Sequence, residues 1–168
     1  MNVCPRRPVL HSEMVIAAAA SGARGILLEK PFARTLSEAD AFSCILGYTI
    51  GNDVSELSWQ SSDRTLWRAK NIDTFKQMGP WIETDVVLSK LRTQVRVNGE
   101  VVSDFPTNNM LFGVEHYISV MTQHLTLIPG DMIWMGTDGA TQNMKPGDVC
   151  EIDIEGIGVL SNPIVAEG

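Results

Sequence analysis

The pattern of apolar and polar positions predicts two different textures along the chain. In residues 8–42 it predicts helix, short strand and helix. Residues 13–21 are alanine-rich and end before Gly22, which is typical of a helix stop, and residues 25–28 form a short apolar run suited to a buried strand. Thr35 is the predicted N-cap of the second helix, because Glu38 follows it at the spacing of a capping box.

From Ile45 onward, short apolar runs separated by turn residues predict strands. The first run, 46–50, is predicted to close at Gly51-Asn52, and the run 86–97 leads into Asn98-Gly99, the strongest short hairpin signal. One helix is predicted over 114–124, where apolar residues recur at helical spacing. Further predicted strands are 100–102, 132–135, 149–154 and 159–160. The fold class is therefore α+β, predominantly β, with a rolled or barrel-like sheet and one main helix.

Composition places the chain among ordinary acidic globular domains. Its 168 residues suit one domain, and 44% hydrophobic residues supply a core. The net charge is −7, and no basic cluster exists beyond Arg6-Arg7, which argues against a nucleic-acid partner. An acidic protein repels small carboxylates at long range, so a carboxylate site needs a local cation.

Neither a membrane span nor a disulfide framework is predicted. The longest apolar stretch near the start, 14–20, is far shorter than a membrane helix. The three cysteines, Cys4, Cys44 and Cys150, are widely spaced and form no CxxC pair, which favours free thiols in a reducing compartment. The predicted location is the cytoplasm.

A series of motifs resembles those of one known family. Residues 47–55, GYTIGNDVS, followed by Trp59-Gln60, resemble the "GYTxxNDVSxRDxQ" signature of fumarylacetoacetate hydrolase (FAH)-like enzymes. The segments 68–75 and 79–81 resemble the next block of that family. Later blocks follow in family order at 97–100, 127–131, 136–137, 144–148 and 154–163. The resemblance covers residues 37–166.

The resemblance implies a mixed β-roll, a homodimer and a Mg²⁺-dependent (or Mn²⁺-dependent) enzyme of small 2-oxo or 1,3-dioxo carboxylic acids. Mg²⁺ prefers oxygen ligands and keeps positions open for a chelating substrate, whose enolate it can stabilise. By the resemblance, Asp53 is a metal ligand, Lys70 is an active-site cation, and Gln60 and Thr137 contact the substrate. The reactions that share this scaffold include C–C bond hydrolysis, decarboxylation and hydration, and the fold does not choose among them.

Each assignment has a purely structural alternative. Asp53 after Asn52 is also typical of a turn. Lys70 and the nearby Arg68 could be solvated charges, and Thr137 could be a turn hydroxyl. Three tryptophans are interpreted as core residues rather than as a platform for substrate: Trp59, Trp67 and Trp81.

Three departures from the family pattern leave the predicted metal site incomplete. The family's Glu-x-Glu ligand pair falls near residues 21–23, where this chain has Ser-Gly-Ala. Leu57 and Ser58 stand where the family has an arginine and an acid. The chain therefore lacks the arginine that could bind a carboxylate at this position. The family's His–Glu lid element is matched only by residues 11–14, and its spacing is one residue short.

Residues 8–42 also resemble a piece of the glucose–fructose oxidoreductase-like (Gfo/Idh/MocA) dehydrogenases, in segments 11–17 and 28–32. Lys30 would then lie beside a nicotinamide, but no GxGxxG turn precedes it. The interpretation is an atypical N-terminal segment, 1–42, fused to an FAH-like catalytic domain, 43–168. Three functions follow: the metal-dependent enzyme, a catalytically inactive dimeric protein of the same fold and, least favoured, a nicotinamide dehydrogenase.

Overall fold

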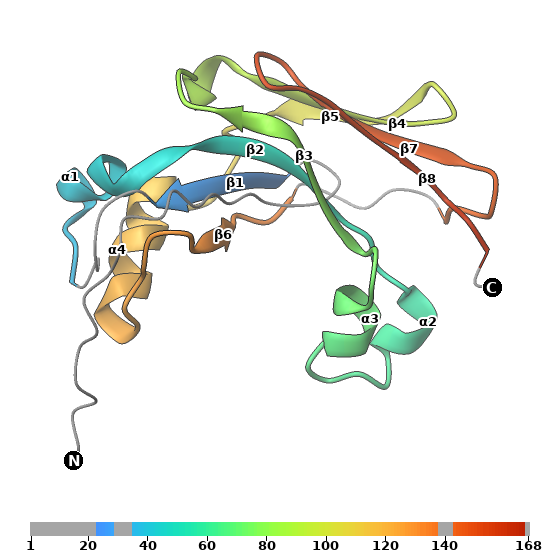
Figure 1. The fold of residues 1–168 in the computed structure, drawn as a ribbon, viewed down its shortest axis with the longest axis horizontal. Helices are drawn as coiled ribbons and strands as arrows, with labels where there is room; N and C mark the ends of the chain where they lie inside the picture. Colours follow the sequence, from blue (N-terminus) through green and yellow to red (C-terminus); the bar gives the residue numbers. More distant parts are fainter. Residues whose placement is uncertain (1–22, 29–34, 138–142, 167–168) are drawn as a thin grey trace.

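Two four-stranded sheets, each with antiparallel pairing, form the body of the protein (Figure 1). The computed structural model describes residues 23–28, 35–137 and 143–166, the first of these by its backbone alone. In spatial order, the first sheet contains β3 (Lys76–Glu83), β2 (Ile45–Asp53), β1 (Ala23–Leu28) and β6 (Met132–Trp134). The second contains β5 (Glu100–Pro106), β4 (Arg92–Val97), β7 (Val149–Ile154) and β8 (Gly158–Pro163).

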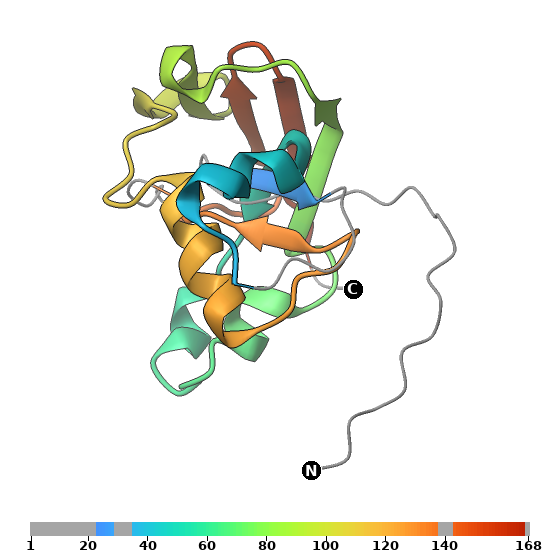
Figure 2. The ribbon, with the colours of Figure 1, turned by 90° about the vertical axis from the view of Figure 1, so that its left-hand side faces the viewer.

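The helices lie at the two ends of the first sheet. The helix α4 packs against α1 at one end, whereas α2 and α3 form a small lobe below the other, between β2 and β3 in the chain (Figures 1 and 2). The α-helices are α1 (Glu38–Ala41), α2 (Leu57–Gln60), α3 (Trp67–Asn71) and α4 (Val114–His124), and the 3₁₀ turns are η1 (Phe42–Cys44) and η2 (Leu88–Lys90). Among the described residues, no helix is long and apolar enough to cross a membrane.

The core lies between the two sheets and extends to α4. Alternation along β7 buries Cys150, Ile152 and Ile154. Ile50 of β2 and Ile118 of α4 are fully buried in the same cluster. Each such isoleucine contributes about 1.5–3 kcal/mol of hydrophobic stabilisation, so the apolar pattern explains why the strands occupy these positions.

The strongest local signals are confirmed. The helix predicted over 114–124 is α4, and the residues predicted as strand 149–154 form β7. Asn98 and Gly99 join β4 to β5 with φ of 54° and 84°, as a tight hairpin with two positive φ angles requires. Asn98 Nδ2 also donates to Asp148 Oδ1 at 2.9 Å, which ties the hairpin to the turn before β7.

The predicted end of the first strand is wrong. β2 continues through Gly51 and Asn52 to Asp53, because Asn52 is buried and its Nδ2 donates to Asn162 Oδ1 of β8 at 3.0 Å. That partner lies far along the chain, so a local turn signal cannot reveal it.

The predicted cap of the second helix is also wrong. Thr35 has φ of 56° and its backbone N–H donates to the carbonyl of Thr122, whereas Ser37 caps α1 by accepting from Asp40 N at 3.2 Å. The helix predicted over 13–21 lies outside the described residues.

Two further expectations fail in the middle of the chain. Of the predicted strand 86–97, only β4 is a strand, and β3 was not predicted because Gly79-Pro80 interrupts its pattern. Trp67 and Trp81 are 67% and 57% exposed, so they are not core residues.

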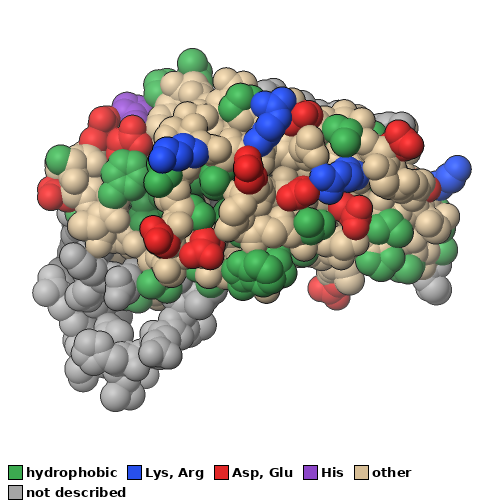
Figure 3. Space-filling view, turned by 90° about the horizontal axis from the view of Figure 1, so that it is seen from above, with side chains coloured by type: hydrophobic (Ala, Val, Ile, Leu, Met, Phe, Trp, Pro, Cys, Tyr) green, Lys and Arg blue, Asp and Glu red, His purple; other side chains and the backbone are tan. Residues whose placement is uncertain are grey.

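Figure 3 shows acidic and basic side chains interspersed with apolar ones over one face of the molecule.

Candidate functional site

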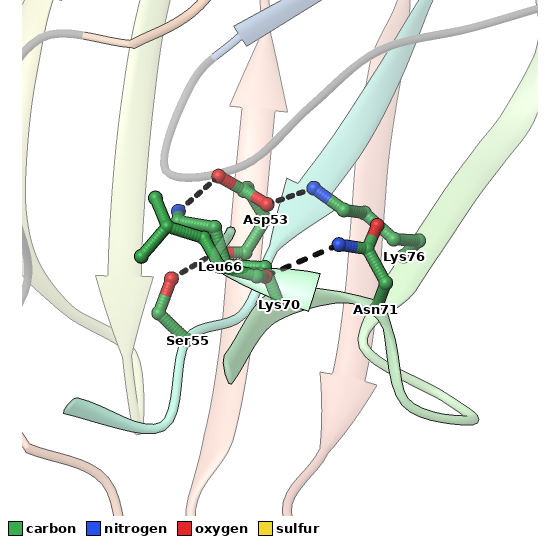
Figure 4. A network of polar contacts seen from close by, with 6 residues as sticks. All are labelled: Asp53, Ser55, Leu66, Lys70, Asn71 and Lys76. Atoms are coloured by element: carbon green, nitrogen blue, oxygen red, sulfur yellow. Dashed lines mark hydrogen bonds and ion pairs between the residues drawn. The ribbon is translucent and has the colours of Figure 1, made fainter. Parts of the chain in front are cut away.

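The register of β2 and β3 brings Asp53 and Lys76 together. Asp53 is the last residue of β2 and pairs directly with Lys76, the first residue of β3. Directly opposed residues on antiparallel strands present their side chains on the same face. Lys76 Nζ accordingly forms an ion pair with Asp53 Oδ1, and Figure 4 shows this contact on one side of the carboxylate.

Lys70 reaches the other oxygen of the same carboxylate from α3. Its Nζ lies 2.5 Å from Asp53 Oδ2 (Figure 4). The α3 turn is fixed by Asp63, whose Oδ2 accepts from Ala69 N at 2.9 Å, and by Glu56, whose N donates to the carbonyl of Ala69 at 2.9 Å. The Ala69 N–H lowers the pKa of the Asp63 carboxyl, so Asp63 accepts this bond as an anion at neutral pH.

An aromatic ring from β6 holds the second ammonium group. Lys76 Nζ lies 4.2 Å from the centroid of the Trp134 ring, which is a cation–π distance. The Asp53 side chain is 20% exposed, and those of Lys70 and Lys76 are 24% and 31% exposed. The three charges are therefore half-buried but reachable by a small solute.

Two of the four predicted site residues, Asp53 and Lys70, lie in direct contact. Gln60 ends α2 with an exposed side chain. Thr137 lies three residues after Trp134, within about 11 Å along an extended backbone. Arg68 stacks on Trp59 at 3.9 Å instead of joining the Asp53 cluster.

Thr137 lines a hollow of about 260 Å³. Asp53, Lys70 and Gln60 are not part of its lining. The wall combines the end of β5, the loop before α4, α4 itself and the segment after β6: Phe105, Asn109, Met110, Leu111, Phe112, Tyr117, Met135, Gly136 and Thr137. The described part of the molecule thus presents a charged cluster and an open, largely apolar hollow linked by residues 134–137.

Buried titratable groups near the core are held in their neutral forms. Burial, and secondarily the charge of Glu115, raises the pKa of Tyr48 to about 12. Burial also raises the pKa of the Cys150 thiol, which keeps it protonated. Neither group is poised to act as a nucleophile at neutral pH.

Comparison with known families decides the relationship that the motifs indicate. The sequence model for the fumarylacetoacetate (FAA) hydrolase C-terminal domain matches residues 22–165. The chain belongs to this family. The FAH fold, α+β and predominantly β, is confirmed by solved relatives, among them the fumarylacetoacetate hydrolase of Exiguobacterium antarcticum, with a TM-score of 0.83 over 88% of this chain and 56% of that one.

Relatives within the FAH family carry the names of enzymes. The 2-hydroxyhepta-2,4-diene-1,7-dioate isomerase of Mycobacterium marinum is 40% identical, with a TM-score of 0.80 over 91% of this chain and 62% of that one. The mitochondrial oxaloacetate tautomerase fahd2 of Xenopus laevis is 35% identical over 79% of this chain and 45% of its own length. The chain spans about half the length of the first curated relatives that it matches, 53%, 50% and 56%.

The family match also includes residues 22–42, which are part of the segment that resembles an oxidoreductase. β1 lies in this range and pairs with both β2 and β6, so it belongs inside the first sheet. The resemblance to the Gfo/Idh/MocA dehydrogenases finds no support. The division of the chain at residue 42 stays a prediction.

The described residues of this family member do not fit the Mg²⁺ ion that the resemblance implies. Both oxygens of Asp53 are engaged by ammonium groups, and no set of three or more His, Cys, Asp or Glu side chains gathers in the described ranges. Mg²⁺ needs several oxygen ligands in a near-octahedral arrangement. A divalent ion at Asp53 would lie beside two ammonium groups and would find a single carboxylate ligand in the described ranges.

Sequence reasoning missed Lys76 and Trp134 as members of this cluster. The motif comparison assigns no role to Lys76, although it lies six residues after Lys70. Its signal is the register of β2 with β3, which was invisible because β3 was not predicted. The roles of Asp53, Lys70, Gln60 and Thr137 in binding and catalysis stay predictions.

Proposed function

We propose that the chain is the catalytic-domain part of an enzyme that acts on small 2-oxo or 1,3-dioxo carboxylic acids. The observation that carries this proposal is the Asp53–Lys70–Lys76 cluster: two ammonium groups in a protein of net charge −7. Such a cluster supplies the local positive charge that a small carboxylate needs to overcome the long-range repulsion of an acidic protein. Membership of the FAH family and the enzyme names of its relatives agree with this class.

The chemistry follows from where negative charge develops. Removing a proton next to a 2-oxo group, or breaking the adjacent C–C bond, leaves an enolate. An ammonium group that is already in place stabilises that charge without reorganisation, and it does so more strongly in a half-buried site than in water. Lys70 and Lys76 would bind the substrate carboxylate and the developing enolate oxygen, while Asp53 holds the two lysines in place.

The reaction class proposed is therefore an isomerisation, decarboxylation or C–C bond hydrolysis of a 2-oxo acid. Names in the family cover these reactions: an isomerase/decarboxylase of Salmonella dublin, 35% identical, and a hydrolase of 2,4-didehydro-3-deoxy-L-rhamnonate in Sphingomonas, 36% identical. Asp53 is a single carboxylate between two lysines, so the proposed stabilisation uses the ammonium groups of the chain itself.

We propose further that the chain forms a homodimer in the cytoplasm. A group of exposed apolar side chains surrounds the hollow, with Leu111 91%, Phe112 57% and Tyr117 40% exposed, and such patches are typical of contact surfaces. The described cysteines, Cys44 and Cys150, are free, which suits a reducing compartment. Light scattering coupled to size exclusion would give twice the monomer mass; a monomer would contradict the dimer.

A panel assay tests the enzymatic proposal. Oxaloacetate and an acylpyruvate are followed by the ultraviolet absorbance of their enol forms, with the wild type, Lys70→Met and the control Lys90→Met. We expect turnover of at least one substrate and a loss of about a hundred- to a thousand-fold in kcat for Lys70→Met, the range for one lost electrostatic donor. Lys90, exposed on η2, should be neutral.

The second candidate is a folded protein of the same family without activity. The lack of a carboxylate set beside Asp53 in the described residues favours it. If no substrate of the panel is turned over, although circular dichroism and light scattering show a folded dimer, this candidate is supported and the enzymatic one is overturned.

A further inference from the structure

The fold holds the ammonium group of Lys76 in a fixed position beside Asp53. It begins β3, pairs in register with Asp53 at the end of β2, and forms an ion pair with Oδ1. Its Nζ also lies 4.2 Å from the Trp134 ring centroid. Contacts to a carboxylate and an aromatic face restrict the rotamers of a long side chain before any ligand arrives, which lowers the entropic cost of binding.

The charge count of the cluster favours an anion. One carboxylate (−1) and two ammonium groups (+2) leave a net charge of +1. An ammonium group has three N–H donors, and the contacts of Lys70 and Lys76 with Asp53 engage one donor each. The remaining N–H donors can serve a ligand, and a small dicarboxylate or 2-oxo acid offers its acceptor oxygens in a planar pair.

The same geometry opposes a divalent cation. A metal ion approaching Asp53 meets two positive charges, one beside each carboxylate oxygen. It would also lack further acidic or imidazole ligands among the described residues.

We propose that Lys76 replaces a divalent metal beside Asp53, so that a small 2-oxo acid anion binds the Lys70 and Lys76 ammonium groups without a metal ion. The inference rests on the substrate class of the proposed function. It adds a residue, Lys76, that the family motif does not assign, and a metal-free mode of binding.

Calorimetry on the full chain, dialysed against EDTA, tests the proposal. Oxalate, a planar dianion with two chelating oxygen pairs, and pyruvate are titrated first in EDTA and then with excess Mg²⁺; Mg²⁺ alone is titrated separately. The variants are Lys76→Met, which keeps chain length without charge, Lys76→Arg, which keeps charge, and the control Lys90→Met.

The proposal expects oxalate to bind in EDTA with an affinity that Mg²⁺ does not raise, and Mg²⁺ alone to give no saturable heat. Lys76→Met should weaken oxalate binding by about ten- to a hundred-fold, the loss of one charge-assisted hydrogen bond. Lys76→Arg should retain part of the affinity, and Lys90→Met should match the wild type.

Three other outcomes overturn the proposal, and they do so in two distinguishable ways. Binding of oxalate only with Mg²⁺, or equal binding by folded Lys76→Met, would refute the metal-free role of Lys76 and leave the proposed substrate class standing. No binding of oxalate or pyruvate in either condition, by a chain that circular dichroism shows to be folded, would remove both the proposed function and this inference.

Discussion

Two neighbouring side chains of β2 have different roles: Asp53 belongs to the candidate site, and Asn52 belongs to the core. At Asp53, a carboxylate is shared by two ammonium groups from different elements, so its position depends on both. At the neighbouring residue the side chain points the other way, into the space between the sheets, where Asn52 meets Asn162. Adjacent residues of one strand thus serve the site and the core.

The buried amide pair leads to a prediction about stability. Asn162→Ala removes the acceptor of the Asn52 Nδ2 group, which is 3.0 Å away, and leaves a buried donor unpaired. We expect a loss of about 1–3 kcal/mol in the free energy of unfolding. Urea denaturation followed by tryptophan fluorescence measures it.

The adjacent Ser161 is exposed and provides a matched control. Ser161→Ala should change the free energy of unfolding by less than about 0.5 kcal/mol. Equal stabilities of Asn162→Ala and wild type would show that the two sheets are not linked by this bond.

Among the elements, those fixed by local signals were predictable and those fixed by distant contacts were not. The apolar spacing of α4 and the Asn98-Gly99 hairpin carry their own structural information. The true end of β2 depends on Asn162, and the strand character of β3 depends on pairing with β2. The motif resemblance therefore predicted roles for Asp53 and Lys70, which lie in contact, but could not place Lys76 beside them.

The short helix α3 depends on an acid outside it, and this gives a pH prediction. Asp63 accepts from Ala69 N, and that bond lowers the Asp63 pKa from the ordinary 3.8. A carboxyl with a depressed folded pKa stabilises the fold above its unfolded pKa, and the contribution is lost as pH falls through the folded value. The Ala69 amide proton shift in a nuclear magnetic resonance titration should move with a midpoint below 3.8.

Asp63→Asn is the control for this titration. It should abolish the pH-dependent movement of the Ala69 amide, while amides of β7, far from Asp63 in the chain, keep their wild-type profiles. A midpoint at or above the ordinary value in the wild type would show that Asp63 does not hold α3, and therefore Lys70, in place.

For the whole molecule, charge distribution matters more than total charge. The chain carries −7 overall, yet the Asp53 cluster is locally positive. The hollow lined by Thr137 and the exposed residues Leu111 and Phe112 lie on the segments that lead to and from α4. The chain spans about half the length of the first curated relatives that it matches, and the charged cluster lies within this part.

The most direct measurement is a crystal structure of the full chain with oxalate, grown in EDTA. The account predicts oxalate oxygens within about 3.2 Å of Nζ of both Lys70 and Lys76, with Asp53 still between the two lysines. Oxalate bound elsewhere, or bound through a metal ion coordinated by Asp53 with Lys76 displaced, would contradict it.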